Sequence, residues 1–275
     1  MTYIYADNAA TTRLSDAAFD AMKPYMLNEY GNASTLYKLG RSAHKAVENA
    51  RGVFAKGINA LPAEIYFTSG GTESDNWAIK GTAHRLAASG KKHIVTDNIE
   101  HHAVLNSAKA LEREGFEVTC VSADKNGIVR AEDITAAIRP DTALVSVMFA
   151  NNELGTIQPV EEIGSICRSE GVLFHCDAVQ AAGILPIDVK QMNIDLLSMS
   201  AHKFHGPKGV GIMYARRGCV PETYIDGGEQ ERGHRAGTEN VAGIVGAAAA
   251  FAEAMSERNE KADRLCAMRD EIQSG

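Results

Sequence analysis

The chain has 275 residues, 45% hydrophobic and 23% charged, which excludes a disordered tail, a collagen-like repeat and a small disulfide-stabilised domain. Its formal net charge of −7 argues against a surface built mainly for nucleic acid or an anionic membrane. The five cysteines lack a CxxC pair, which is typical of a reducing compartment and predicts a cytoplasmic protein. We expect neither a signal peptide nor a membrane span, because no uninterrupted apolar stretch reaches ~18 residues.

The predicted elements alternate between helices and strands. Helices come first, at residues 16–27 and 41–59. Apolar runs without polar alternation then predict strands covered on both faces, at residues 64–68, 93–97, 117–121, 143–149, 172–177, 195–200 and 209–215. Longer amphipathic segments predict the remaining helices, at residues 73–88, 102–114, 131–138, 160–170, 241–258 and 259–272.

This alternation predicts an α/β fold with a mostly parallel seven-stranded sheet and helices on both faces. The last strand follows the sixth without an intervening helix, so we expect it to run antiparallel. Ligands of open parallel sheets bind beyond the carboxyl ends of the strands. The residues that follow each predicted strand are therefore the candidates for a functional site.

Two of these strand ends carry candidate ligand-binding groups. After residue 68, a turn of Ser69, Gly70 and Gly71 precedes Thr72, which opens a helix; this suits a phosphate group, although an ordinary capped turn fits the same residues. After residue 200, Lys203 lies among small residues. In apolar surroundings it would be a nucleophile able to form a Schiff base, and in water it would be an ordinary loop lysine.

Two further strand ends carry a carboxylate and an imidazole. Asp177 ends an apolar strand, where it needs a fixed positive partner such as a protonated pyridine nitrogen, or it caps the next helix. His101 and His102 start a helix, and one of their two imidazoles could lie flat on an aromatic ligand. A second interpretation gathers histidines around a metal ion, but no HExxH or CxxC pattern accompanies them, and we expect no metal. The histidines in question are His101, His102, His175, His202 and His205.

Two loops complete the set of candidate residues. The loop at 150–155 can supply an amide from Asn151 or Asn152, and the loop at 231–240 contains Arg232, Arg235 and Thr238, either as an anion contact or as a basic surface loop. A nucleophilic amine, a buried carboxylate, a stackable imidazole and a phosphate-binding turn are the groups that a pyridoxal 5'-phosphate site requires.

Seven segments, in order along the chain, resemble the cysteine desulfurases of the NifS/IscS type, fold-type I pyridoxal-phosphate enzymes of the class V aminotransferase superfamily. They are YADNAATT (5–12), TSGGTESDN (68–76), EHHAV (100–104), NNELGTIQP (151–159), HCDAVQ (175–180), SAHKFHGPKG (200–209) and RGHRAGTEN (232–240). The resemblance implies a three-layer α/β/α large domain at 16–255. It also implies an N-terminal segment at 1–15 that associates with a small domain, which starts at 256–275 and is largely missing from the chain.

The resemblance also implies the role of each site residue. Pyridoxal 5'-phosphate would form a Schiff base with Lys203, which would also move protons at the substrate, while His101 stacks on the ring and Asp177 keeps the ring nitrogen protonated. Asn152 and Gln180 would lie near the ring hydroxyl. The phosphate would be bound by Gly71, Thr72, Ser200 and His202, and by Thr238 from the neighbouring subunit of a homodimer.

In that family L-cysteine is converted to L-alanine, and its sulfur passes as a persulfide to an acceptor or an iron–sulfur scaffold protein. None of the five cysteines matches the family's persulfide cysteine, which lies in the C-terminal small domain, so we expect the chain as given not to complete desulfuration. The alternatives are a selenocysteine lyase or an aminotransferase of the same class, and a catalytically silent cofactor-binding scaffold. We expect buried Cys120, Cys167 and Cys176, and more exposed Cys219 and Cys266.

Overall fold

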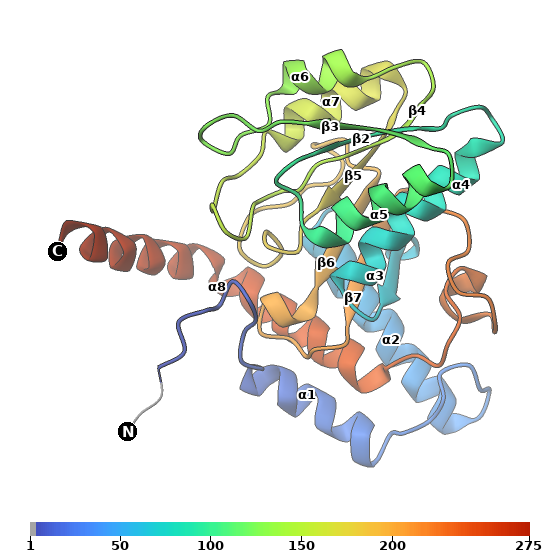
Figure 1. Cartoon of the computed structure of the whole chain (residues 1–275). Coiled ribbons are helices and arrows are strands. Elements are labelled where there is room, and N and C mark those ends of the chain that lie inside the picture. The colour runs from blue at the N-terminus through green and yellow to red at the C-terminus, as the bar shows by residue number, and fades with distance from the viewer. Residues whose placement is uncertain (1–3) are drawn as a thin grey trace.

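The structure, a computed structural model, describes residues 4–275 and is built on one seven-stranded sheet (Figure 1). The strands are β1 (Ile65–Thr68), β2 (His93–Asp97), β3 (Glu117–Val121), β4 (Thr142–Ser146), β5 (Leu173–Asp177), β6 (Leu196–Ser200) and β7 (Gly211–Ala215). They lie in the order β1-β7-β6-β5-β4-β2-β3. Only β7 runs antiparallel to its neighbours, so the seven predicted strands and the direction of the last one are confirmed.

Helices cover both faces of the sheet, as the alternation of elements predicts. One face carries an unbroken helical segment followed by a separate helix, which are α3 (Gly71–Asn76), the π-helical turn η2 (Trp77–Gly81), α4 (Thr82–Ala87) and α5 (His102–Arg113). The other face carries α2 (Lys38–Gly57), α6 (Ala131–Ala137), α7 (Val160–Glu170) and α8 (Val241–Ser274), with α1 (Asp16–Leu27) packed on α8. Short 3-10 turns are η1 (Pro62–Glu64), η3 (Ala201–Lys203) and η4 (Gln230–Gly233).

The alternation of side chains along the strands divides the core into two layers. On β1, the ring of Tyr66 meets Trp77 at a centroid distance of 5.4 Å on one face, whereas Phe67 meets Phe54 at 6.1 Å on the other. All four rings are buried. The strands inside the sheet are therefore covered on both sides, which is why the sequence shows continuous apolar runs.

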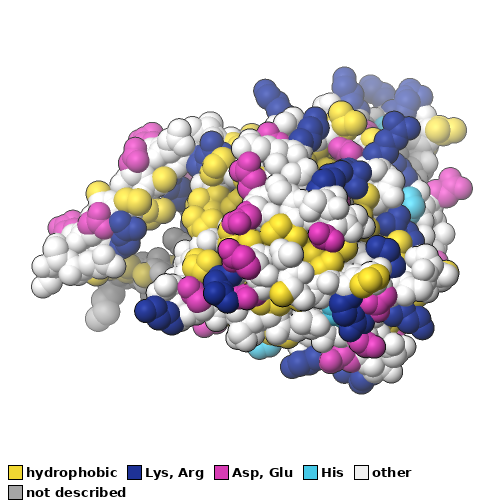
Figure 2. Space-filling view, turned by 90° about the horizontal axis from the view of Figure 1, so that it is seen from above, with side chains coloured by type: hydrophobic (Ala, Val, Ile, Leu, Met, Phe, Trp, Pro, Cys, Tyr) yellow, Lys and Arg dark blue, Asp and Glu magenta, His cyan; other side chains and the backbone are white. Residues whose placement is uncertain are grey.

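The C-terminal helix α8 is one continuous helix, although the sequence analysis treats 241–258 and 259–272 as separate segments. No glycine or proline interrupts the sequence where they meet, so nothing ends the helix there. Its first half is buried, with Phe251 stacked on Phe54 at 4.9 Å. Its second half stands away from the body and exposes Leu265, Met268 and Ile272 (Figures 1 and 2).

The helix also crosses the predicted boundary between residues 255 and 256 without a break. The first three residues of the predicted segment 1–15 lie outside the described residues. Within residues 4–275, no helix combines the length and the hydrophobicity needed to cross a membrane.

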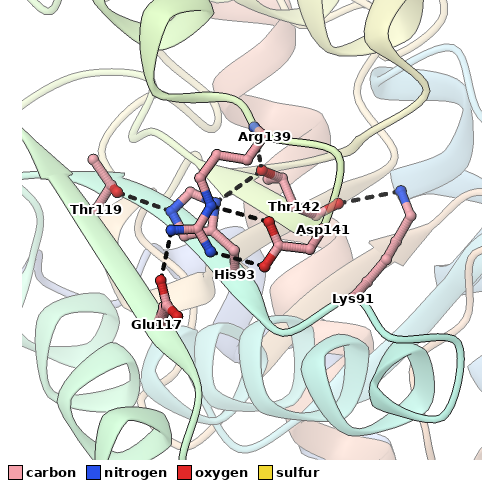
Figure 3. A network of polar contacts seen from close by, with 7 residues as sticks. All are labelled: Lys91, His93, Glu117, Thr119, Arg139, Asp141 and Thr142. Carbon is pink, nitrogen blue, oxygen red and sulfur yellow. Dashed lines mark hydrogen bonds and ion pairs between the residues drawn. The ribbon is translucent and has the colours of Figure 1, made fainter.

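A polar network holds the amino ends of β2, β3 and β4 together (Figure 3). The buried His93 forms hydrogen bonds with the hydroxyl groups of Thr142 and Thr119, both at 2.8 Å, and Arg139 donates two hydrogen bonds to Asp141 at 3.0 and 2.8 Å. Burial, and secondarily the charge of Arg139, lower the pKa of His93. The network fixes the register of these strands at the edge opposite their carboxyl ends.

Candidate active site

A cavity of about 530 Å³ lies where the carboxyl ends of the parallel strands meet. Nine of the ten predicted site residues line it, namely Gly71, Thr72, His101, Asn152, Asp177, Gln180, Ser200, His202 and Lys203. They come from the segments that follow β1, β2, β4, β5 and β6. Parallel strands bring their carboxyl ends to one edge, so residues far apart in the sequence converge here.

The turn after β1 and the start of α3 form one wall of the cavity. A Cβ atom added to Gly71 would lie 2.6 Å from Cγ2 of Val179, so only glycine lets the two segments approach this closely. The helix that begins at Gly71 presents its first N–H groups beside Thr72 and the buried Ser200. His202 lies near Gly71 and Thr72 at this wall, and burial lowers the pKa of its imidazole. The wall suits a phosphate group.

Lys203 lies in η3, directly after β6, and is half-buried. Its Nζ donates hydrogen bonds to the carbonyl oxygens of Ala9 and, at 3.1 Å, Ala10. Gln180 Nε2 donates to the same Ala9 carbonyl at 3.0 Å. Burial lowers the pKa of Lys203, and the Asp177 carboxylate opposes this shift. A lowered pKa makes the amine a better nucleophile than an exposed lysine.

The sequence analysis did not assign the N-terminal segment to the cavity. Asp7, Ala9 and Ala10 nevertheless line it, and the backbone carbonyls of Ala9 and Ala10 accept hydrogen bonds from the lysine. The only signal in the sequence was the motif at 5–12, which carries no side chain typical of such a contact.

Two adjacent acids line the cavity floor, and their surroundings differ. Burial raises the pKa of Asp177, but the amide of Val179, which donates to Oδ1 at 2.9 Å, and the charge of Lys203 lower it. Burial raises the pKa of Asp75 well above its usual value, and the neighbouring Asp177 raises it further. Burial raises the pKa of both acids, but only Asp177 has lowering contacts strong enough to offset part of the shift, so Asp75 favours its protonated form more strongly than Asp177 does.

His101 is fixed by the helix that it begins. Its Nδ1 accepts a hydrogen bond from the amide of Ala103 at 3.1 Å, which caps α5. A ring nitrogen that accepts carries no proton, so Nε2 carries the proton of the neutral ring. The ring is exposed toward the cavity.

The structure distinguishes the two candidate amides of the loop after β4. Asn151 is buried, donates from Nδ2 to the carbonyl of Ile99 at 2.8 Å, and accepts hydrogen bonds from the amides of Glu153 and Leu154. Asn152 lines the cavity. Asn151 therefore shapes the loop, and Asn152 is the amide of the two that lines the cavity.

Further carboxyl groups lie behind the floor, and the sequence analysis missed them. Burial raises the pKa of Asp97, at the end of β2, to about 6, and burial together with Asp97 raises that of Glu100 well above its usual value. They differ from surface acids in sequence only by following the apolar run of β2. The strongly raised pKa of Glu100 favours its neutral form, whereas a pKa of about 6 leaves Asp97 largely ionised at neutral pH.

Within residues 4–275, no three His, Cys, Asp or Glu side chains are placed to hold a metal ion. His175 is instead buried between the hydroxyl groups of Ser146, at 2.9 Å, and Ser198, at 3.0 Å. His205 contacts the carbonyl of Arg13. His175 and His205 therefore form contacts away from the cavity, which is lined by His101 and His202.

The expected burial of the cysteines is wrong at two positions. Cys120 is exposed because β3 is an edge strand, and Cys219 is buried beneath the turn after β7. Cys167 and Cys176 are buried and Cys266 is exposed, as expected. None of the five belongs to the cavity lining within the described chain.

Thr238 is the one predicted site residue that the cavity does not include. It is exposed and lines a small hollow of about 120 Å³ with Ser69, Gly209 and Arg235. The same loop begins with Glu231 and Arg232, which both have positive φ values (46° and 59°). Non-glycine residues adopt this conformation at a cost, so neighbouring contacts hold the loop in place.

Comparison with known proteins places the chain in a family. The aminotransferase class-V family matches residues 4–267. Cysteine desulfurase IscS of Methanosarcina thermophila is 51% identical over 272 residues, which are 99% of this chain and 67% of that protein. A putative cysteine desulfurase IscS 1 of Bacillus subtilis is 48% identical over 264 residues, covering 96% of this chain and 69% of that protein.

Solved structures show the same fold. A NifS-like protein superposes with a TM-score of 0.97 at 44% identity and covers 99% of this chain and 75% of its own. A structure described as SspA in complex with cysteine gives a TM-score of 0.88 at 41% identity, covering 91% of this chain and 72% of its own. The chain belongs to the class V aminotransferase family, among the NifS- and IscS-like cysteine desulfurases.

Proposed function

We propose that the chain binds pyridoxal 5'-phosphate on Lys203 and acts as a cysteine desulfurase, which releases L-alanine from L-cysteine and passes the sulfur as a persulfide to an acceptor or an iron–sulfur scaffold protein. The observation that carries the proposal is the convergence of Lys203, Asp177 and the wall at Gly71 on one cavity. The name of one structural neighbour, which was solved with cysteine, supports this substrate.

The residues present fit this cofactor. Asp177 is a buried carboxylate that needs a cation, and the protonated ring nitrogen would supply one. The close approach permitted by Gly71 leaves room for a phosphate at the start of α3. When bound, the cofactor withdraws electrons from the substrate carbon whose bonds are broken.

The chain's own residues would orient the reactants and move protons. Lys203 would hold the cofactor and then, once displaced, accept and return a proton at Nζ, for which its lowered pKa is suited. His101 would lie on the ring and could give or take a proton only at Nε2, because Nδ1 is occupied by the Ala103 amide. Asn152 and Gln180 would orient the ring hydroxyl.

The same proposal includes a homodimer in which Thr238 reaches the phosphate of the neighbouring subunit. Its support is that Thr238 is exposed and outside its own cavity, on a loop held in a conformation that costs energy. We also propose a cytoplasmic location, which the five free cysteines support.

The proposal is tested by cofactor attachment. The chain incubated with pyridoxal 5'-phosphate should gain a visible absorption band that Lys203→Ala abolishes and that Lys109→Ala, at an exposed lysine on α5, leaves intact. A colourless wild-type protein would exclude the proposal.

The substrate is tested by the products formed from L-cysteine. Alanine together with sulfide or persulfide supports a desulfurase, whereas a keto acid would indicate an aminotransferase. A coloured protein that yields neither would indicate a cofactor-binding scaffold, and the absence of a cysteine from the described cavity lining is the observation in favour of that alternative.

A further inference from the structure

An ion pair joins the wall of the cavity to the loop that carries Thr238. Arg235 Nε donates to Glu73 Oε1 at 2.7 Å and Arg235 Nη2 to Glu73 Oε2 at 3.2 Å, so the pair is bidentate. Both side chains are largely buried, with exposed fractions of 20% for Arg235 and 11% for Glu73. A bidentate arginine–carboxylate pair fixes both partners in one geometry.

Glu73 borders the proposed phosphate site, because it lines the hollow beside the cavity together with Gly71, Thr72, Ser200 and His202. It follows Thr72 in the first turn of α3, and its Oε2 accepts a hydrogen bond from the amide of Ser69 at 2.8 Å. The carboxylate therefore spans the turn and fixes its shape. Burial would raise the pKa of Glu73, but the hydrogen bonds from Arg235 and Ser69 hold it below its usual value.

A carboxylate at this position creates an electrostatic problem. The phosphate that the turn would bind is itself an anion, and it would meet a like charge in a partly buried wall, where screening by water is weak. Arg235 is the side chain that forms an ion pair with Glu73 in the described chain. The nearby Glu231 does not compete for Arg235, because it is bonded to Arg51 at 2.9 and 3.1 Å.

We propose that Arg235 is a positioning residue for cofactor binding: it neutralises Glu73, so that Glu73 can shape the turn without repelling the cofactor's phosphate. This inference rests on the proposed function and adds a residue to it. Arg235 itself need not touch the cofactor, because it acts through Glu73. Its contribution should therefore be specific to the phosphate and should depend on the carboxylate.

The test compares the affinities of pyridoxal 5'-phosphate and of pyridoxal, which lacks the phosphate. Both are titrated by absorbance and by the fluorescence of Trp77, the one tryptophan of the chain, which follows α3 directly. We expect Arg235→Met to raise the Kd for pyridoxal 5'-phosphate on the order of tenfold, or about 1.4 kcal/mol, and to leave the Kd for pyridoxal unchanged. Arg130→Met, which removes an exposed arginine on another part of the surface, is the charge-matched control.

The second mutation tests the dependence on Glu73. Glu73→Gln keeps an acceptor for the Ser69 amide but removes the charge. We therefore expect this variant to have a larger ratio of the Kd for pyridoxal to the Kd for pyridoxal 5'-phosphate than the wild type has. The double variant Glu73→Gln/Arg235→Met should recover most of the affinity that Arg235→Met loses. Arg235→Lys should keep most of the affinity, because the charge is retained.

The outcomes separate the two proposals. If the wild type binds neither compound, the proposed function fails. If the wild type binds both and Arg235→Met weakens them equally, or if the double variant recovers nothing, the role assigned to Arg235 is wrong while the proposed function stands. Should Arg235→Met fail to fold, an unchanged preference in Glu73→Gln would still overturn the inference.

Discussion

The buried His175 should make the protein lose stability as the pH falls, by an amount that the structure sets. The imidazole is fully buried on β5, and burial lowers its pKa to about 3. In the unfolded chain a histidine has a pKa of about 6.5. Between these two values the unfolded state binds a proton that the native state does not, so stability is complete above pH ~6.5 and is lost below it at about 1.4 kcal/mol per pH unit. From pH 7.5 to pH 5, the loss is about 2 kcal/mol.

The assay is urea unfolding of the wild type and of His175→Gln at both pH values. The glutamine can still bond to Ser146 and Ser198 but does not titrate. At pH 7.5 we expect His175→Gln to be the less stable protein, and at pH 5 the gap should have closed by about 2 kcal/mol. The buried carboxyls titrate in both proteins, so their effect cancels in the difference.

A gap that stays constant within about 0.5 kcal/mol would refute the assignment of a neutral histidine. The neighbouring Asp75, whose Oδ1 lies 3.6 Å from His175 Nε2, supplies a second check. If Asp75 is protonated, as its raised pKa indicates, adding Asp75→Asn to both proteins should leave the pH dependence of their stability difference unchanged. If Asp75 were ionised, it would stabilise the imidazolium, and the substitution would steepen that dependence.

Two pairs of matched substitutions test the packing and the loop after β4. Gly164→Ala on α7 would place a Cβ 1.9 Å from the carbonyl oxygen of Met192 and should lower the free energy of unfolding in urea by about 1–3 kcal/mol. Gly52→Ala on α2 meets no atom within 4 Å and should raise that free energy by about 0.5–1 kcal/mol. Equal effects would contradict the close approach at Gly164. Asn151→Ala should lower both the melting temperature and the affinity for pyridoxal 5'-phosphate, whereas Asn152→Ala should lower the affinity alone. The reversed pattern would mean that Asn152 shapes the loop and Asn151 binds the ligand.

The strands were predictable because burial on both faces leaves a continuous apolar run in the sequence. Burial that depends on strand order was not predictable. Cys120 lies on β3 in a run resembling the others, but β3 occupies the edge of the sheet and one side of it faces water. Cys219 is buried, and Arg85, far away in sequence, contacts its turn through the carbonyl of Gly218. Neither the order of strands nor such a long-range contact leaves a local pattern.

The same distinction explains which site residues could be found. Asp177 ends β5 and Lys203 lies in the turn after β6, and parallel pairing alone brings such positions to a common edge, so their convergence follows from the order of elements. The carbonyls of Ala9 and Ala10 reach Lys203 from a segment that belongs to no strand, and they act through backbone atoms that every residue has. The ion pair of Glu73 and Arg235 is intermediate: each residue belongs to a recognisable motif, but their pairing depends on how the loop at 231–240 folds back onto β1. Sequence patterns thus locate the groups attached to the sheet, and the structure supplies the contacts that set their charge and position.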